Sequence, residues 1–94
     1  MRDYELVLII NPQVEDEKVP QVLEKVGHLI TDKGGAVGEV TPWGRRKLAY
    51  PIKKRLEGYF VVAKAKMDPA NVGELENQLR LSEDFLRHLV VKVE

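Results

Sequence analysis

A short stretch near the middle of the chain concentrates cations and aromatic side chains. It reads Trp43-Gly44-Arg45-Arg46-Lys47-Leu48-Ala49-Tyr50-Pro51-Ile52-Lys53-Lys54-Arg55, with six cations, two aromatics and no acid. Such cations can neutralise several phosphates, and the aromatics can stack on splayed bases or cover an apolar partner. A solvated edge strand that its lysines protect from aggregation would have the same composition. Composition alone therefore leaves two interpretations open, RNA contact and a charged sheet edge.

Residues that could catalyse a reaction show no catalytic pattern. The chain has no cysteine, which excludes a disulfide framework, a thiolate metal site and a cysteine nucleophile. His28 and His88 have no serine or cysteine motif beside them, so structural or surface roles are favoured. The acids of residues 15–17 fit the dipole at a helix start, and Gly34-Gly35 follows a helix, the wrong order for a phosphate loop. We therefore expect no enzyme activity, metal, cofactor or small-molecule substrate.

The charge of the chain sums to zero from unlike parts. Residues 1–42 carry four Lys/Arg against eight Asp/Glu, residues 43–66 carry eight against one, and residues 67–94 carry three against six. A concentrated basic segment creates a local positive potential whatever the net charge, so an anionic partner is indicated.

The N-terminus lacks the regions of a signal peptide, and no apolar run approaches the ~20 residues of a membrane span. We expect a soluble protein without membrane contact.

The first half of the chain predicts a strand, a helix and a second strand. Residues 2–10 alternate like a strand that Asn11-Pro12 ends, and residues 36–52 form a strand region that Pro42 and Gly44 should bend or bulge, at a sheet edge. Between them, apolar residues at helical spacing form one stripe on a helix that begins at Asp16 as N-cap, has Pro20 about one turn in and stops at Gly34 and Gly35. The stripe comprises Val19, Val22, Leu23, Val26, Leu29 and Ile30.

The second half predicts a hairpin, a shorter helix and a last strand. Residues 55–58 are expected to connect the second strand to a third at residues 59–67. Asp68 and Pro69 are typical of an N-cap and first helical position, and Phe85–Val93 forms the last strand. The order strand, helix, strand, strand, helix, strand indicates an α+β fold, a split β-α-β arrangement in one domain over residues 1–94. Right-handed crossovers place both helices on one face of an antiparallel sheet and leave the other bare.

The bare face should carry an apolar strip rimmed by lysines. If Leu6, Leu8, Val61, Ala63 and Ala65 face the helices, strand alternation sends their neighbours to the open face. Those neighbours are Glu5, Val7, Ile9, Phe60, Val62, Lys64 and Lys66. Such a strip is a candidate contact surface for protein or nucleic acid, although scattered apolar residues on an open sheet are also ordinary.

An RNA-recognition motif shares this topology and stacks bases on aromatics of its third strand. Residues 58–62, Gly-Tyr-Phe-Val-Val, resemble that signature only faintly. Aromatics must alternate to share a face, and here two valines follow Tyr59 and Phe60, so neither face gains two rings. The spacing argues against this motif.

Four segments carry a more specific signal. They are Met1-Arg2-Asp3-Tyr4-Glu5 with Asn11-Pro12, Trp43 to Ile52 as quoted above, Gly58-Tyr59-Phe60, and Arg87-His88-Leu89-Val90-Val91-Lys92. Together they closely resemble the bacterial small-subunit ribosomal protein S-six family over essentially the whole chain. The resemblance implies a ferredoxin-like fold, binding to the central domain of small-subunit ribosomal RNA, and pairing with ribosomal protein S-eighteen. It also implies a ribosome-bound, cytoplasmic protein that supports ribosome assembly and translation.

The resemblance also implies which residues make contacts. For RNA phosphates the candidates are Arg2, Arg46, Lys47, Arg87 and Lys92, with Tyr4 and Tyr50 as supporting aromatics and Lys53, Lys54 and Arg55 as candidates at the hairpin tip. For the protein partner the candidates are Trp43, Phe60 and Val62 on the open face. Many relatives continue with a charged tail where this sequence ends at Glu94, so any role of such a tail is expected to be either naturally absent or lost by truncation. When isolated, the chain is expected to be a monomer.

Two other classes of function share the topology. An acylphosphatase-like hydrolase needs an anion-binding loop with an arginine after the first strand, and Asn11-Pro12-Gln13-Val14 offers no cation. A small-molecule regulatory domain would dimerise through its open face. The leading hypothesis is an assembly-type RNA-binding protein that anchors by charge and shape without turnover.

Overall fold

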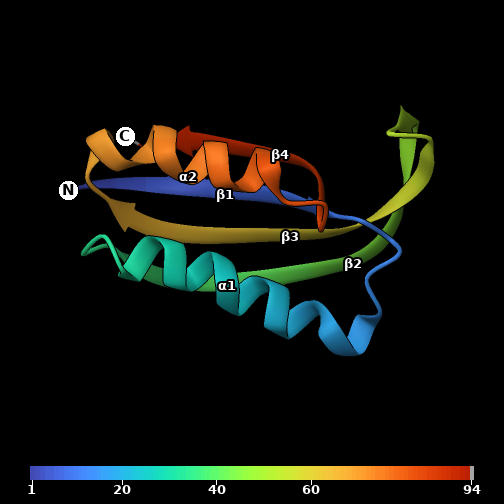
Figure 1. Ribbon diagram of the computed structural model, residues 1–94, viewed down its shortest axis with the longest axis horizontal. Coiled ribbons are helices and arrows are strands. Elements are labelled where there is room, and N and C mark those ends of the chain that lie inside the picture. Colours follow the sequence, from blue (N-terminus) through green and yellow to red (C-terminus); the bar gives the residue numbers. More distant parts are fainter. Residues whose placement is uncertain (94) are drawn as a thin grey trace.

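Four strands form one antiparallel sheet in the order β2-β3-β1-β4, and two helices complete the fold (Figure 1). The computed structural model describes residues 1–93, and Glu94, where the absence of a tail was expected, lies outside the described residues. The elements are β1 (Arg2–Ile10), the 3₁₀ turn η1 (Asp16–Lys18), α1 (Val19–Thr31), β2 (Ala36–Ile52), β3 (Arg55–Met67), α2 (Pro69–Leu81) and β4 (Phe85–Lys92). The predicted β-α-β-β-α-β class is confirmed.

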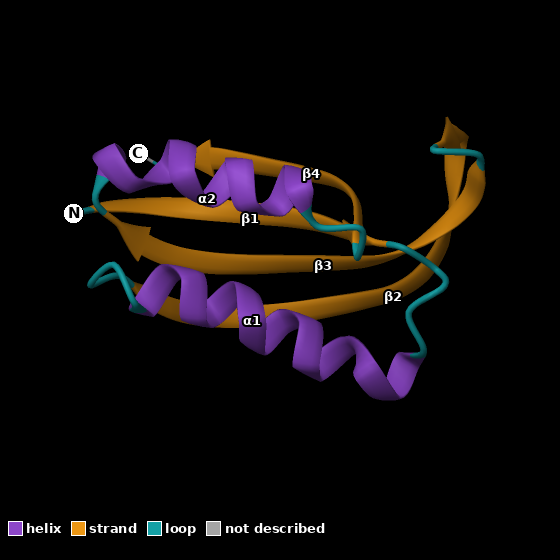
Figure 2. Ribbon diagram, in the orientation of Figure 1, coloured by secondary structure: helices purple, strands orange, loops and turns teal. Residues whose placement is uncertain are grey.

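Both helices lie on one face of the sheet and bury a single core against it (Figure 2). Five strand residues predicted to face the helices are at most 5% exposed: Leu6, Leu8, Val61, Ala63 and Ala65. The helices contribute the periodic residues of their stripes, with Val19, Val22, Val26 and Ile30 buried from α1 and Leu75 and Leu79 from α2. At ~1.5 to 3 kcal/mol for each fully buried side chain, this core is the main stabilising contribution that offsets the entropy of ordering the chain.

The start of α1 differs from its prediction. Asp16 does not cap this helix: it opens η1, and Lys18 is the N-cap residue, without a side-chain capping bond. The Asp16 carboxylate instead accepts a hydrogen bond from Nε of Arg45, at 3.0 Å. The Asp16 carboxylate, predicted to cap α1, therefore forms an ion pair with a residue distant in sequence instead. The helix ends as predicted, because Gly34 adopts a left-handed φ of +82° and donates its N–H to the carbonyl of Thr31.

The edge strand β2 is long and irregular, as predicted. It occupies the outer position in the sheet and pairs only with β3 among the described residues. Its register shifts between Val37 and Val40, between Pro42 and Gly44, and again between Lys47 and Ile52. Gly44 has a φ of +85°, which a residue with a Cβ rarely adopts. The proline and glycine therefore mark a bulge that bends the strand without ending it.

The hairpin between β2 and β3 turns earlier than predicted. Residues 55–58 belong to β3, and the turn consists of Lys53 and Lys54, with φ values of +49° and +65°. A two-residue turn with two positive φ values matches the right-handed twist of its strands, although Asn-Gly is its usual sequence. Gly58, taken for a turn residue, is instead buried within the strand. A Cβ there would collide with Cγ2 of Ile9, so close packing explains the glycine.

The last helix and strand follow the prediction closely. The Asp68 carboxylate accepts a hydrogen bond from the N–H of Ala70 at 3.0 Å, which confirms it as the N-cap of α2. β4 pairs antiparallel with β1 and carries a register shift beside Ile9 and Ile10. His88 pairs opposite the core residue Leu8, and its Nε2 lies 4.0 Å from Oε2 of Glu76 on α2. His88 therefore occupies the helix side of the sheet, a point that alternation alone left open.

Candidate nucleic-acid and protein interface

The open face of the sheet carries an apolar strip that crosses three strands. Val7 of β1 pairs with Val62 of β3 on one side and with Leu89 of β4 on the other. We define the apolar strip as Val7, Phe60, Val62, Leu89 and Val91. Leu89 and Val91 are 51% and 46% exposed, and the other three are half-buried. Since neither helix covers this side in the described part of the chain, the strip can receive a partner.

One expected member of the open face is withdrawn from solvent. Ile9 is only 9% exposed although its alternation places it with Val7 and Phe60. It packs over Gly58 beside Leu86, the residue that β4 inserts where its register shifts. Ile9 therefore belongs to a small second cluster that closes one end of the apolar strip.

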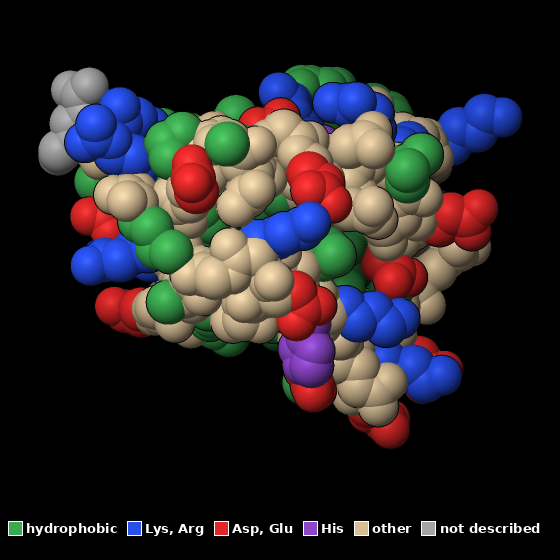
Figure 3. Space-filling model, turned by 60° about the vertical axis from the view of Figure 1, so that its left-hand side comes forward, with side chains coloured by type: hydrophobic (Ala, Val, Ile, Leu, Met, Phe, Trp, Pro, Cys, Tyr) green, Lys and Arg blue, Asp and Glu red, His purple; other side chains and the backbone are tan. Residues whose placement is uncertain are grey.

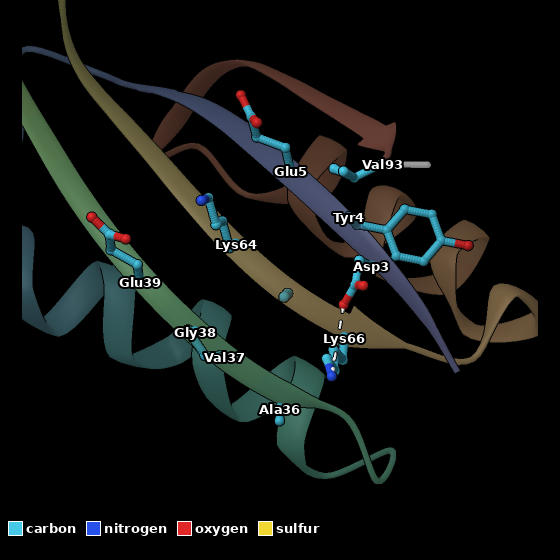
Figure 4. A pocket seen from close by; sticks show the side chains of 11 residues that line it. Asp3, Tyr4, Glu5, Ala36, Val37, Gly38, Glu39, Lys64, Lys66 and Val93 are labelled. Carbon is cyan, nitrogen blue, oxygen red and sulfur yellow. Dashed lines mark ion pairs between the residues drawn. The ribbon is translucent and has the colours of Figure 1, made fainter.

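The other end of the open face forms a groove of about 530 Å³ (Figure 4). It lies at the gap in the β2–β3 ladder and is lined by charges of both signs, of which Glu5, Glu39 and Lys64 are shown with their side chains on the same side. Lys66 Nζ lies 4.0 Å from Oδ1 of Asp3. Because acids stand beside both lysines, this groove does not favour a polyanion.

Basic and acidic side chains are interspersed on the face shown in Figure 3. The excess of cations in residues 43–66 lies mainly on the β2–β3 hairpin, which extends past both helices and curls away from the plane of the sheet (Figure 1).

The hairpin end brings together most of the predicted RNA contacts. Exposed side chains there are Arg46, Lys47, Tyr50, Lys53 and Lys54, and Arg87 of β4 joins them. Nη1 of Arg87 donates a hydrogen bond of 2.8 Å to the Tyr50 hydroxyl, and Lys53 Nζ donates one of 3.3 Å to the carbonyl of Phe85. We call these six residues the basic hairpin end.

Trp43 stands next to this basic surface. Trp43 is the sole tryptophan of the sequence and is 53% exposed. The guanidinium carbon of Arg46 lies 5.6 Å from the centroid of the Trp43 ring. Such a cation–π contact contributes on the order of 0.5–1 kcal/mol at an exposed site and limits the positions open to both groups. The predicted partner residue and a predicted RNA residue therefore form one continuous surface.

Arg45 has a role that sequence reasoning missed. Its guanidinium pairs with Oδ1 of Asp16 at 2.9 Å and donates to the carbonyls of Pro12 and Val14, both at 3.2 Å. It thus ties β2 to the loop that leads from β1 to α1. No local pattern distinguishes Arg45 from Arg46, since only the bulge decides which of two neighbours points toward that loop.

The same arginine bears on the acylphosphatase-like alternative. A cation does reach the loop after β1, which the sequence of that loop alone did not predict. Its donors are directed at two backbone carbonyls and at Asp16, and Glu57 Oε1 lies 3.6 Å from Nη1. A guanidinium engaged in this way does not form an anion cradle.

The remaining predicted RNA residues lie at the opposite end of the sheet. Arg2 and Lys92 are exposed near the start of β1 and the end of β4. Seven strand positions separate Arg2 from Ile9, beside which Arg87 pairs, so the two groups of cations are roughly 20 Å apart. They could contact one RNA only along an extended surface.

Tyr4 requires a correction. It was expected to support RNA contact as an aromatic, but its side chain is only 7% exposed and belongs to the core cluster on the helix side. Its position on β1 alternates with Asp3 and Glu5, and the even positions Tyr4, Leu6 and Leu8 all turn inward. A buried ring cannot stack on a base, so Tyr4 leaves the candidate set.

Comparisons with known proteins agree with this fold. A family model described as Ribosomal protein S6 matches residues 3–92. The chain is 44% identical over 94 residues to small ribosomal subunit protein bS6 of Moorella thermoacetica, covering all of this chain and 96% of that protein. The bS6 protein of Desulforudis audaxviator is 40% identical over 92 residues, with 98% of each covered.

A solved structure gives the same result in three dimensions. The crystal structure of 30S ribosomal protein S6 from Thermotoga maritima superposes with a TM-score of 0.90 at 34% identity, covering 98% of this chain and 87% of that one. Among residues 1–93, no helix has both the length and the apolar composition that crossing a membrane requires.

Proposed function

The chain belongs to the ribosomal protein S6 family of the small ribosomal subunit, and from this premise we propose that it binds the central domain of small-subunit ribosomal RNA together with ribosomal protein S-eighteen. This is a family of structural ribosomal proteins and not of enzymes. We propose that residues 1–94 act as one RNA-binding domain, bound to the ribosome in the cytoplasm, and support assembly and translation through binding alone.

The observation that carries the RNA part of the proposal is the basic hairpin end. Five cations there, together with Tyr50, come from two segments far apart in the sequence. Each phosphate that a cation neutralises releases counterions, which gives affinity that falls with salt. Arg46, Lys47 and Arg87 are the central proposed contacts, with Lys53 and Lys54 at the tip. Arg2 and Lys92 are proposed as a second, separate anchor.

The partner part of the proposal is supported by the apolar strip and Trp43. The strip is open on the side opposite the helices, and Phe60 and Val62 belong to it as expected. Trp43 adds an exposed apolar ring that contacts Arg46 of the basic hairpin end. A protein seated on the strip would bury apolar surface at ~25 cal/mol per Å² and would still leave the basic hairpin end free for RNA.

The salt dependence of RNA binding tests this proposal. The purified chain is titrated onto a central-domain RNA fragment, with and without ribosomal protein S-eighteen, at several salt concentrations. We expect log K to fall with log salt with a slope of roughly −4 for about five contacts, and the Arg46→Ala slope to be shallower by about one contact. A salt-independent affinity, or no binding even with the partner protein present, would refute the proposal.

A further inference from the structure

A small hollow opens where the end of α2, the start of β4 and the hairpin turn meet. Its volume is about 200 Å³, several times the ~30 Å³ that one water occupies in the liquid. Its apolar floor includes Leu79 and Phe85, which are 1% and 5% exposed and belong to the core. The floor of the hollow is therefore part of the close-packed core.

Basic side chains line the hollow from three separate elements. Lys53 comes from the hairpin turn, Arg80 from the last turn of α2, and Arg87 with His88 from β4. No aspartate or glutamate of residues 1–93 lines it. Because these residues lie far apart in the sequence, they come together only in the folded chain. No sequence motif therefore predicts the site.

Two of these side chains are positioned by contacts that leave donors free. Lys53 Nζ donates to the Phe85 carbonyl at 3.3 Å and has two further N–H groups, and Arg87 uses Nη1 on Tyr50 and has four. Within residues 1–93, no carboxylate oxygen lies within 4.0 Å of Lys53, Arg80 or Arg87. The cations of the hollow therefore lack a counterion among the described residues.

His88 closes the wall beside α2. Its Nε2 lies 4.0 Å from Oε2 of Glu76, with the two side chains 17% and 36% exposed. Glu76 is not among the described residues that line the hollow. The Glu76 carboxylate lies 4.0 Å from His88 and forms no ion pair with Lys53, Arg80 or Arg87.

We propose that this hollow binds a phosphate group of the RNA backbone, with Arg80 as a contact that neither the sequence nor the family resemblance assigned. The proposal rests on the RNA binding proposed above and extends it, since Lys53 and Arg87 belong to both. Guanidinium groups match phosphate oxygens in a fork geometry, and two of them flank this site. A phosphodiester inserted here would be held by α2 and β4 as well as by the hairpin.

The test compares two exposed helical cations. Arg80→Gln removes the proposed contact, and Lys25→Gln on α1 makes the same charge change at a residue that does not line the hollow. Both replacements keep a good helix former, and urea midpoints check that both variants fold. With a central-domain RNA fragment, we expect Arg80→Gln to lose three- to tenfold in affinity and about one contact in salt slope, while Lys25→Gln stays near wild type.

A second arm identifies the phosphate. Single neutral methylphosphonates are placed along the RNA, and the position that weakens wild-type binding is measured again with Arg80→Gln. We expect one position whose effect disappears in the variant, because the two changes remove the same contact. Inorganic phosphate and an oligoglutamate peptide are titrated as competing anions.

The outcomes separate this inference from the function on which it rests. Wild-type RNA binding with identical slopes for Arg80→Gln and Lys25→Gln overturns the phosphate site and leaves the proposed function standing. Arg80-dependent binding of oligoglutamate or inorganic phosphate, with RNA affinity unchanged by Arg80→Gln, assigns the hollow to another anion and overturns it as well. Absence of any RNA binding by the wild-type chain removes both proposals.

Discussion

Arg87 and Tyr50 join the two opposite edges of the sheet. Arg87 lies on β4 and Tyr50 on β2, which are the outer strands of the order β2-β3-β1-β4, yet Nη1 of Arg87 donates to the Tyr50 hydroxyl at 2.8 Å. The contact is possible because the hairpin extends past the sheet and curls toward β4. Together with the hydrogen bond from Lys53 to the Phe85 carbonyl, it fixes the hairpin that carries most of the proposed RNA contacts.

Tyr50→Phe should loosen this hairpin while leaving the core intact. The change removes only the hydroxyl that accepts from Arg87, at a side chain that is 57% exposed. We expect the free energy of unfolding to fall by less than about 1 kcal/mol, since the hydrogen bond is exposed to water. Amide hydrogen exchange in residues 45–57 should speed up more than exchange in β1. Equal acceleration in both regions would show that Tyr50 does not tether the hairpin.

Arg45→Ala and Arg46→Ala should affect different properties. Arg45 is bound to Asp16 and to two loop carbonyls, so its loss should lower the free energy of unfolding by about 1 to 2 kcal/mol. Arg46 contacts the exposed Trp43 ring and has no ion pair or side-chain hydrogen bond among residues 1–93, so its loss should change stability by less than about 1 kcal/mol and weaken RNA binding instead.

These two neighbours control for each other, because they are identical in type and adjacent in sequence. Urea unfolding and the salt slope of RNA affinity are measured for both variants. A shallower salt slope for Arg45→Ala with an unchanged one for Arg46→Ala would reverse the proposed assignment.

The elements of this fold were predictable wherever local chemistry and periodicity agreed. Alternation identified β1, the apolar stripe of residues 19–30 identified α1, and the Asp68-Pro69 pair located the start of α2. Proline at 42 and glycine at 44 indicated the bulge of β2. Each of these signals depends on residues within one element, and at these positions no tertiary contact overrode it.

The predictions were wrong mainly where a contact between residues distant in sequence determined the local structure. Asp16 is a residue type typical of an N-cap, but its carboxylate accepts a hydrogen bond from Arg45, 29 positions away in the sequence. Gly58 has the composition of a turn, but it accommodates Ile9 on the neighbouring strand. Likewise the Lys53-Lys54 turn lacks the residues usual for positive φ. Tyr4 is a different case, because alternation already placed it with Leu6 and Leu8, and its assignment to RNA contact came from the family resemblance.

Gly58→Ala should destabilise the fold strongly for a change of one methyl group. The added Cβ would collide with Cγ2 of Ile9 and lie 3.4 Å from the Ile10 carbonyl oxygen. Ile9 is branched at Cβ and nearly buried, so it cannot swing aside. We expect a loss of about 1 to 3 kcal/mol in the free energy of unfolding, measured by urea titration.

Gly73→Ala provides the matched control for this substitution. Gly73 lies within α2, and a Cβ there would meet nothing within 4 Å. The same change should therefore stabilise the fold by about 0.5 to 1 kcal/mol, because alanine favours the helix and restricts the unfolded chain. If both alanines shift the urea midpoint alike, close packing is not the reason for the glycine at position 58.

Leu89→Ser should weaken association with the proposed protein partner. Leu89 lies at the β4 side of the apolar strip, opposite Val7, and is 51% exposed in the isolated chain. If ribosomal protein S-eighteen covers the strip, replacing this side chain removes buried apolar surface and leaves a hydroxyl in its place. Full burial of a leucine contributes ~1.5 to 3 kcal/mol, so we expect about a tenfold rise in Kd for its exposed half.

Leu81→Ser is the control that separates the strip from general surface hydrophobicity. Leu81 is 70% exposed at the end of α2, on the opposite side of the sheet from the strip. It offers more exposed apolar surface than Leu89, so a partner that merely seeks hydrophobic surface should lose at least as much affinity there. Calorimetric titration of both variants with the partner decides the matter. A Kd raised by Leu89→Ser and unchanged by Leu81→Ser places the partner on the open face, because only that face presents Leu89.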